Sequence, residues 1–225
     1  SAGVFQFRAI ENIATAEWDR ILDVNLKGTF LVMREAMPHL KASGAGRIVN
    51  IASDAGKRGF ALLAAYCASK FGVVGLTQAV AAEVAPHKVR VNAVCPGTVA
   101  ETQMGKVVID QKIELGFGAS PDEVVRRGAA SFPLQRVGTV ADVVEAILFL
   151  VSEGSNWITG ESIRHPPRDA ISQRTLDSGP SPSAGYTELN ALMAFAQPPR
   201  RAWFGAVPAD DLLSELALSG ARWLL

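Results

Sequence analysis

The chain has 225 residues, 48% of them hydrophobic and 20% charged, which is the composition of an ordinary globular protein. Its formal net charge at pH 7 is zero, which argues against partners recruited by electrostatics, such as nucleic acid or an anionic membrane surface. Charged residues or His interrupt every long apolar stretch, so we predict no membrane span.

The sequence carries no mark of secretion or of a metal site. Its first residues show no basic segment followed by an apolar one, so we predict no signal peptide. Cys67 and Cys95 are expected to be reduced thiols in a buried core. The histidines His39, His87 and His165 form no cluster with zinc-ligand spacing. We therefore expect a cytoplasmic protein without a metal.

The first part of the chain alternates helices and strands. Apolar residues at spacings of three and four predict a helix over residues 17–43, which a Ser-Gly-Ala-Gly run ends. A short apolar, β-branched run at 47–53 predicts a strand buried on both faces. A second helix is predicted over 64–85 and a second buried strand over 89–95.

The second part continues this alternation and then loses it. Residues 100–132 are expected to form a long connection with two helical stretches, followed by a helix over 140–152 and a last strand over 161–164. This order predicts an α/β fold with a parallel sheet and right-handed crossovers. Seven of the twelve prolines follow Arg164. We therefore predict a domain over 1–164 and a separate segment, a linker or a disordered extension, over 165–225.

Tyr66 and Lys70 are the first candidates for chemistry. They are four residues apart on a predicted helix and therefore share one face. An ammonium group beside a phenol favours the phenolate, so we expect Lys70 to lower the pKa of Tyr66. A tyrosine of this kind exchanges a proton with an alcohol or a carbonyl oxygen. The spacing alone is weak evidence, because it also arises by chance in helices.

Further segments strengthen this interpretation. Ser53 stands at the end of the strand predicted at 47–53, thirteen residues before Tyr66, and Asn25 lies in the first helix within DVNLKGTF. The Tyr-Lys pair itself lies in YCASKFGVVGLTQAVAAEVA, and the chain continues with VNAVCPGTV and PLQRVGTVADVVEAILFLVSEGSNWITGESI. Together these segments resemble the short-chain dehydrogenase/reductase family, from Ser1 to about Arg164.

The resemblance implies the C-terminal half of a Rossmann-like, doubly wound parallel sheet and an alcohol–ketone oxidoreductase that uses NAD or NADP. It implies that Tyr66 is the catalytic acid/base and that Lys70 tunes it and binds the nicotinamide ribose. It implies that Ser53 hydrogen-bonds the substrate oxygen, and that Asn25 holds a water for proton relay. Each residue also has a structural alternative: Asn25 could kink its helix, and Ser53 could end its strand.

The resemblance also implies a cofactor-binding loop after the second strand. Val99 is the candidate for a main-chain contact to the nicotinamide, and Pro96, Gly97 and Thr102 are placed beside it. Thr102 falls three residues after Val99, where the family usually has two. Ala2 and Gly3 match the family segment that reads Asn-Ala-Gly-Val, with Ser1 in place of the Asn. Together with Asn25, Tyr66 and Lys70, they are expected to contact the cofactor.

Two departures from the family change the expectations. The sequence contains no G-x-x-x-G-x-G turn to hold a pyrophosphate, so we expect the first strands to be missing and cofactor binding by this chain to be weak. After TGESIR the family pattern stops, and residues 165–225 are either a genuine extension or the product of a shifted reading frame.

Substrate and partners are less constrained. The long 100–132 connection resembles that of polyol and small secondary-alcohol dehydrogenases, with reduction of a ketone on an acyl carrier protein as the alternative. We expect a homo-oligomer formed through helices 17–43 and 64–85. A non-catalytic remnant that pairs only through these helices is the competing hypothesis. A serine hydrolase centred on Ser53 is disfavoured, because the G-x-S-x-G motif is absent.

Overall fold

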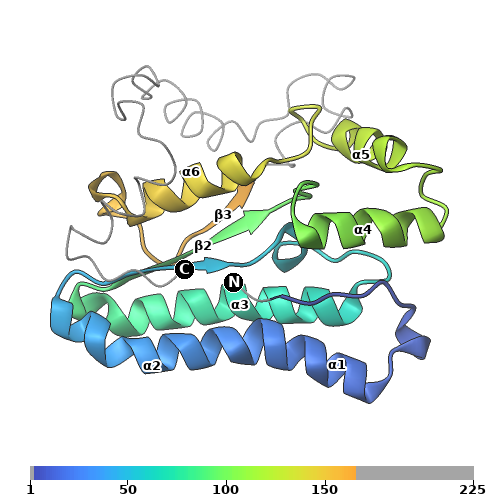
Figure 1. The fold of residues 1–225 in the computed structure, drawn as a ribbon. Coiled ribbons are helices and arrows are strands. Elements are labelled where there is room, and N and C mark those ends of the chain that lie inside the picture. The colour runs from blue at the N-terminus through green and yellow to red at the C-terminus, as the bar shows by residue number, and fades with distance from the viewer. Residues whose placement is uncertain (1–2, 166–225) are drawn as a thin grey trace, which may run out of the picture. The chain divides into compact units, whose positions relative to one another are not determined.

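The computed structural model describes residues 3–165 of the chain. Within this range three strands form one parallel sheet in the order β1-β2-β3 (Figure 1). The strands are β1 (Arg47–Ile51), β2 (Arg90–Pro96) and β3 (Ser162–His165). Ile51 lies opposite Val94, and Pro96 lies opposite His165. All three strands therefore end at the same edge of the sheet.

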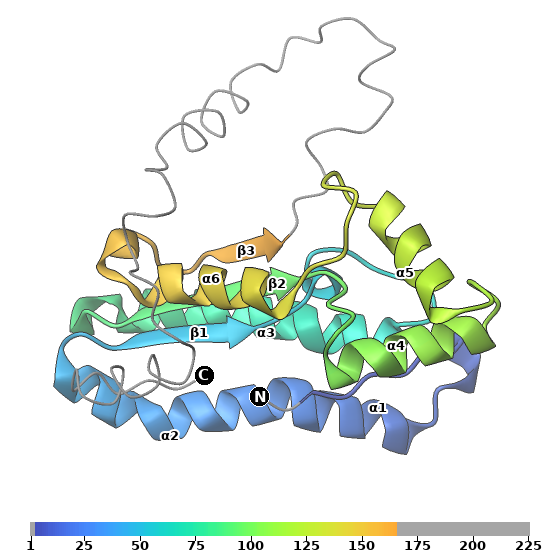
Figure 2. The ribbon, with the colours of Figure 1, turned by 45° about the horizontal axis from the view of Figure 1, so that its top comes forward.

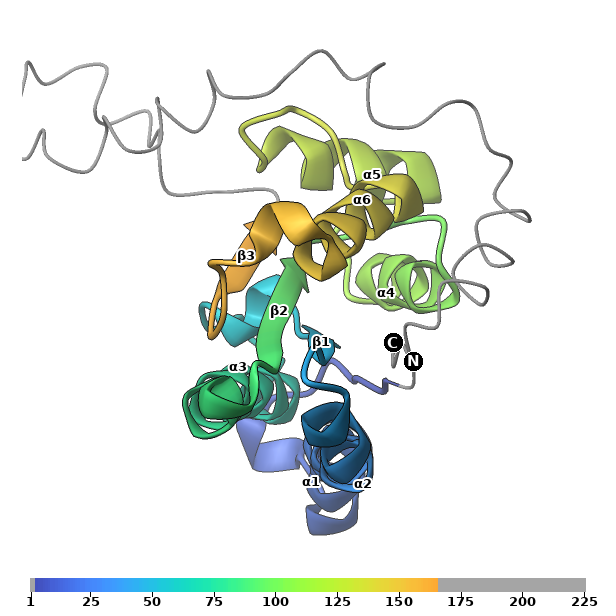
Figure 3. The same ribbon diagram turned by 90° about the vertical axis from the view of Figure 1, so that its left-hand side faces the viewer.

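Helices lie on both sides of this sheet, as Figures 1 and 3 show. One side is covered by α1 (Thr15–Leu22), α2 (Gly28–Ser43) and α3 (Ala64–Val84), and the other by α6 (Val140–Val151). The helices α4 (Gln103–Glu114) and α5 (Pro121–Ala130) pack together near the carboxyl ends of the strands (Figure 2). Short helical turns occupy Ile10–Asn12, Asp54–Gly56, Ala85–His87 and Glu153–Ser155.

The strands are buried on both faces because each face packs against helices. On one side, Val91 and Ile48 pack against Leu40 and Val84 of α2 and α3. On the other side, Val49 and Val94 pack against α6, whose Leu150 is buried; these residues form one apolar cluster. This burial explains why the strands read as continuous apolar runs in the sequence.

Buried asparagines fix how the loops meet the sheet. The side chain of Asn92 donates to the carbonyl of Ile158 at 2.9 Å and accepts from the amide of Glu161 at 3.0 Å. Asn50 donates to the Thr77 hydroxyl at 2.9 Å, which ties β1 to α3. Because a buried amide without partners is costly, the bonds of Asn92 hold the segment that leads into β3 against β2.

The predicted α/β fold with a parallel, doubly wound sheet is confirmed. Strand β1 ends at Ile51 rather than at 53, and β3 extends one residue beyond the expected domain end, to His165. β1 has β2 as its single neighbour among the described strands. The predicted segment 165–225 lies, apart from His165, outside the described residues.

The helix predicted over 17–43 has an unexpected interruption. Residues Asp23–Lys27 form one turn of π-helix between α1 and α2. The bulge contains Asn25, and Gly28 donates its amide to the Asp23 carbonyl at its end. Single π-turns of this kind occur often at functional sites. No helix among residues 3–165 is long and apolar enough to cross a membrane.

Candidate active site

Ser53, Tyr66 and Lys70 meet at the edge where the parallel strands end. Ser53 follows β1 and caps the turn Asp54–Gly56, where its hydroxyl accepts from the Ala55 amide at 3.2 Å. Tyr66 and Lys70 lie in the first two turns of α3. The Ser53 and Tyr66 hydroxyls are hydrogen-bonded to each other. The structure thus brings together three of the residues selected from the sequence.

Lys70 is a buried cation with spare donors. Lys70 is only 6% exposed, and its ammonium donates to the carbonyl of Ile51 at 2.9 Å. Nζ lies 5.8 Å from the centre of the Tyr66 ring. Burial lowers the pKa of Lys70 to about 8, while the Cys95 thiol nearby acts in the opposite direction. One hydrogen bond leaves two N–H groups without an acceptor among the described residues.

The pKa of Tyr66 differs from the sequence expectation. Burial raises it above its usual value, and the hydrogen bond with Ser53 opposes this only in part. Lys70 points to the Ile51 carbonyl rather than to the phenol oxygen and is not among the causes of the shift. The prediction that Lys70 lowers this pKa is therefore wrong for this arrangement, in which Tyr66 is a protonated donor at neutral pH.

Asn25 joins three parts of the chain instead of facing solvent. It is 2% exposed; its side-chain amide donates to the Val4 carbonyl at 2.8 Å and to the Ser69 hydroxyl at 3.0 Å, and its Oδ1 accepts from the Val4 amide at 2.9 Å. The Thr29 hydroxyl donates to its main-chain carbonyl at 2.8 Å. These contacts give Asn25 a positioning role between the π-turn, the first residues and α3.

The expected cofactor contacts lie near the same edge. Pro96 ends β2, and Gly97 follows it. Thr102 caps α4: its hydroxyl accepts from the Gly105 amide and donates to the Val99 carbonyl, both at 2.9 Å. Thr102 is thus engaged within the loop. Gly3 packs beneath α4, where an added Cβ would lie 3.0 Å from Met104 Cε. Ala2 lies outside the described residues.

Two residues near the site, Phe5 and Asp54, were not predicted from the sequence. The ring of Phe5 meets that of Tyr66 edge to face, with centroids 6.0 Å apart. Asp54, only 6% exposed, accepts from Arg164 Nε at 2.8 Å and from Arg58 Nε at 3.3 Å. The position of Asp54 directly after Ser53 was the available signal, but its partner on β3 is 110 residues away along the chain.

Both cysteines are buried free thiols, as expected. Cys95 lies at the end of β2 beside Ser53, and burial raises its pKa. Among the described residues, no group of three His, Cys, Asp or Glu side chains is arranged to hold a metal ion.

The comparisons with known proteins now decide the family. The family model described as short chain dehydrogenase matches residues 1–113, which is half of the chain. The chain belongs to the short-chain dehydrogenase family. Within this family it is 42% identical over 160 residues to the 2-(S)-hydroxypropyl-CoM dehydrogenase 3 of Xanthobacter autotrophicus, a match that covers 71% of this chain and 60% of that protein.

Solved structures of short-chain dehydrogenases share the fold. The NAD+-bound xylitol dehydrogenase matches with a TM-score of 0.69 and 29% identity, over 73% of this chain and 65% of that one. An actinorhodin polyketide ketoreductase with NADPH matches with a TM-score of 0.68 and 35% identity, over 73% and 63%. The chain therefore spans about two thirds or less of the length of these relatives.

Proposed function

We propose that this chain provides the catalytic half of an NAD(P)-dependent oxidoreductase that interconverts an alcohol and a ketone. The observation that carries the proposal is the Ser53–Tyr66–Lys70 arrangement at the carboxyl edge of the sheet, in a chain of the short-chain dehydrogenase family. The NAD+ of the xylitol dehydrogenase and the NADPH of the ketoreductase support either nicotinamide as the cofactor.

The described residues fit the nicotinamide-ribose end of such a cofactor. The two spare N–H donors of buried Lys70 suit a pair of ribose hydroxyls, because a buried ammonium needs acceptors. The loop Pro96–Val99 and Gly3 border the same edge and would contact the nicotinamide. When bound, the nicotinamide supplies or accepts the hydride.

In the reducing direction, Tyr66 breaks its O–H bond and transfers the proton to the carbonyl oxygen of the ketone as that oxygen becomes an alkoxide. Ser53 donates a hydrogen bond to the same oxygen and stabilises its developing negative charge. Because burial raises the pKa of Tyr66 rather than lowering it, the phenol is protonated at neutral pH and the proton that ketone reduction requires is present. Oxidation of an alcohol requires the phenolate and is therefore favoured by alkaline pH.

The proposal is tested by following the absorbance of the reduced nicotinamide with small ketones and polyols. Replacing Tyr66 by Phe should lower turnover by about 10²–10⁴-fold, because the proton donor is removed. Tyr186→Phe alters the other tyrosine of the chain and serves as the matched control. Equal activity of Tyr66→Phe and wild type would show that another group transfers the proton.

Cofactor binding is measured separately by isothermal titration of the chain with NADH and NADPH. The absence of a glycine-rich pyrophosphate turn in this sequence predicts weak binding. Micromolar binding would contradict that expectation while leaving the catalytic assignment intact.

The buried free thiols support a reducing compartment, so we place the protein in the cytoplasm.

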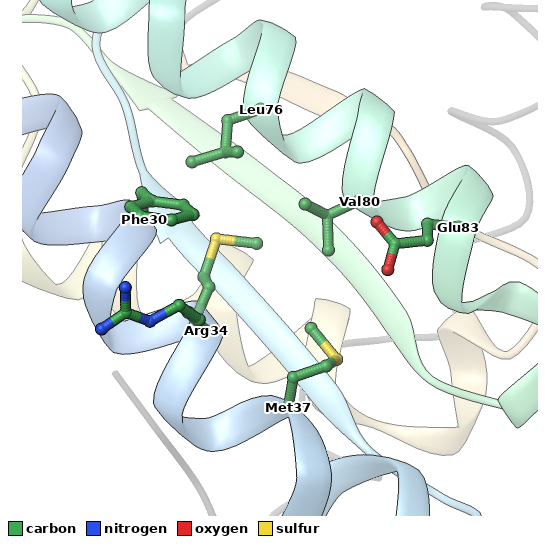
Figure 4. A pocket seen from close by; sticks show the side chains of 7 residues that line it. Phe30, Arg34, Met37, Leu76, Val80 and Glu83 are labelled. Atoms are coloured by element: carbon green, nitrogen blue, oxygen red, sulfur yellow. The ribbon is translucent and has the colours of Figure 1, made fainter.

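A homodimer through α2 and α3 is the second part of the proposal. A groove between these helices is lined by apolar residues with Arg34 and Glu83 at its rim (Figure 4). On α3, Gly72 lies against Leu26 of the same chain, whereas Gly75 faces open space. The apolar lining of the groove is Phe30, Met33, Met37, Leu76 and Val80.

The same interface would also serve the alternative function, in which the chain is not catalytic and only forms a dimer through these helices. Light scattering after gel filtration measures the assembly. Val80→Glu should convert a dimer to a monomer, whereas Val144→Glu on α6, exposed and outside the groove, should leave it unchanged. A dimer that persists in Val80→Glu would exclude this groove, and a dimer without turnover would favour the alternative.

A further inference from the structure

An extended segment near the start of the described chain lies between α3 and α4, where Figures 1 and 2 show it in dark blue. Residues 4–8, which we call the strap, form neither helix nor strand. The side chain of Asn25 holds its beginning through both the amide and the carbonyl of Val4. At its end, the Arg8 amide donates to the Leu62 carbonyl at 2.7 Å. The strap is therefore fixed to the π-turn and to the segment that leads into α3.

Helix α4 holds the strap along its length. The amide of Phe7 donates to the side-chain carbonyl of Gln111 at 3.3 Å. Just before the strap, Gly3 lies beneath Met104, whose Cε would be 3.0 Å from an added Cβ. Met104 and Gln111 are separated by about two helical turns and hence share one face of α4. This face of α4 therefore lies along the strap.

The strap carries two aromatic rings toward Tyr66. Phe5 and Phe7 are alternate residues of an extended segment, so their side chains leave it on the same face. The ring of Phe5 meets that of Tyr66 at an interplanar angle of 72°, with centroids 6.0 Å apart. The rings of Phe7 and Phe5 meet at 89°, with centroids 5.7 Å apart. Both are edge-to-face contacts, which stabilise by more than the area that they bury.

The ring of Tyr66 needs such a neighbour to keep one orientation. The torsion about the bond to an aromatic ring is intrinsically broad, so packing decides how the ring plane lies. The phenol oxygen is at the far end of the side chain, where a small rotation produces the largest displacement. A misplacement of about 1 Å can cost about 10²-fold in rate. A residue that fixes this ring therefore influences proton transfer without contacting the substrate.

We propose that Phe5 is a positioning residue, which holds the ring of Tyr66 so that its hydroxyl faces the substrate oxygen, and that α4 fixes Phe5 through the strap. This inference rests on the proposed function, because the position of the phenol matters for catalysis only if Tyr66 transfers the proton. It adds to the proposed site a residue from a segment that follows the family motif at the start of the chain.

The same contact has an electrostatic consequence. Burial is the largest cause of the raised pKa of Tyr66, and the half-buried ring of Phe5 is one of the groups that cover the phenol. Without this ring, water approaches the phenolate and stabilises it. The pKa of Tyr66 should then fall toward its usual value.

The first test follows ionisation of the Tyr66 phenol by its ultraviolet absorbance as the pH is raised. The chain has two tyrosines, so a Tyr186→Phe parent keeps Tyr66 as its single phenol. In this parent, Phe5→Leu should titrate at lower pH, whereas Phe5→Trp, which retains a ring, should titrate close to the parent. Phe149→Leu, at an exposed phenylalanine of α6, is the matched control and should leave the titration unchanged.

The second test measures ketone reduction in the same variants. Phe5→Leu should lower kcat by about 10–100-fold and leave KM nearly unchanged, because Phe5 positions the proton donor and does not bind the substrate. Phe5→Trp should restore most of the turnover. Circular dichroism establishes that each variant is folded. A folded Phe5→Leu chain with the titration and kcat of the parent overturns the proposal, as does a raised KM with unchanged kcat.

Substitutions on α4 test the role of the strap. Gln111→Leu removes the acceptor of the Phe7 amide at similar size, so it should shift the titration of Tyr66 in the same direction as Phe5→Leu, by a smaller amount. Gln103→Leu, at an exposed position of the same helix, is the matched control. Identical titrations of the two glutamine variants would overturn the link from α4 to the phenol.

The outcomes separate this inference from the proposed function. The titration needs neither cofactor nor substrate, so it reports on the contact of Phe5 with Tyr66 alone. A parent without turnover contradicts the proposed function, and a lower titration in Phe5→Leu would still support the fixing of the phenol by Phe5. A parent that reduces ketones, with the same kcat in Phe5→Leu, leaves the proposed function standing and overturns the positioning role.

Discussion

The burial of Lys70 gives a quantitative prediction about stability. Folding moves its pKa from 10.5 to about 8 because the ammonium is desolvated. Between these two pH values the unfolded chain still binds the proton that the folded chain has released. The free energy of unfolding therefore rises with pH across this window, by about 3 kcal/mol for this one group.

Replacing Lys70 by Met removes the titrating group and keeps an unbranched apolar side chain of similar length. The wild type should gain about 3 kcal/mol more stability than Lys70→Met between about pH 7 and about pH 10.5. Other groups that titrate in this range are common to both proteins and cancel in the difference. Lys70→Met also loses the hydrogen bond to the Ile51 carbonyl. This loss changes the stability of the variant by an amount that does not follow the titration of Lys70.

The measurement is urea unfolding, followed by circular dichroism at a series of pH values for both proteins. Lys88→Met provides the control for loss of a surface lysine. If the curves of wild type and Lys70→Met remain parallel from neutral to alkaline pH, the ammonium is not desolvated in the folded chain, and the reasoning is refuted. A wild type that loses stability relative to Lys70→Met as the pH rises would contradict the sign of the prediction and refute it equally.

Further substitutions test packing around the site. Gly56→Ala places a Cβ 2.6 Å from a backbone carbonyl of α3 and should lower the free energy of unfolding by about 1–3 kcal/mol. Gly75→Ala, whose Cβ faces open space, should raise the free energy of unfolding by about 0.5–1 kcal/mol. Urea unfolding measures both variants, and equal effects would contradict the close approach at Gly56. Asn25→Ala leaves the buried partners of Asn25 unpaired and should lower the free energy of unfolding by about 2–4 kcal/mol. The backbone amides of the first described residues should also exchange their hydrogens faster. Unchanged exchange would show that other contacts hold these residues in place. Leu150→Ala should lower the free energy of unfolding by about 2–5 kcal/mol, because Leu150 is buried. Phe149 is exposed, so Phe149→Ala should lower it far less. If thermal melts gave the reverse order, the buried face assigned to α6 would be wrong.

Much of the fold follows from local patterns. The apolar runs that became β1 and β2 are short and β-branched because helices cover both faces, and apolar residues at spacings of three and four marked the helix predicted over 17–43. The π-turn at Asp23–Lys27 was not predictable in this way, because the side chain of Asn25 finds Val4 and Ser69 only after the chain has folded.

The sequence by itself determined the family, the parallel α/β order and the choice of Ser53, Tyr66 and Lys70, because motif spacing along one helix and at strand ends is local information. Only the tertiary structure decided their electrostatics. Burial raises the pKa of Tyr66 and lowers that of Lys70, and the Ile51 carbonyl draws the ammonium away from the phenol. Desolvation depends on what packs around a group in three dimensions, so the order of the residues did not contain the protonation states from which the chemistry starts.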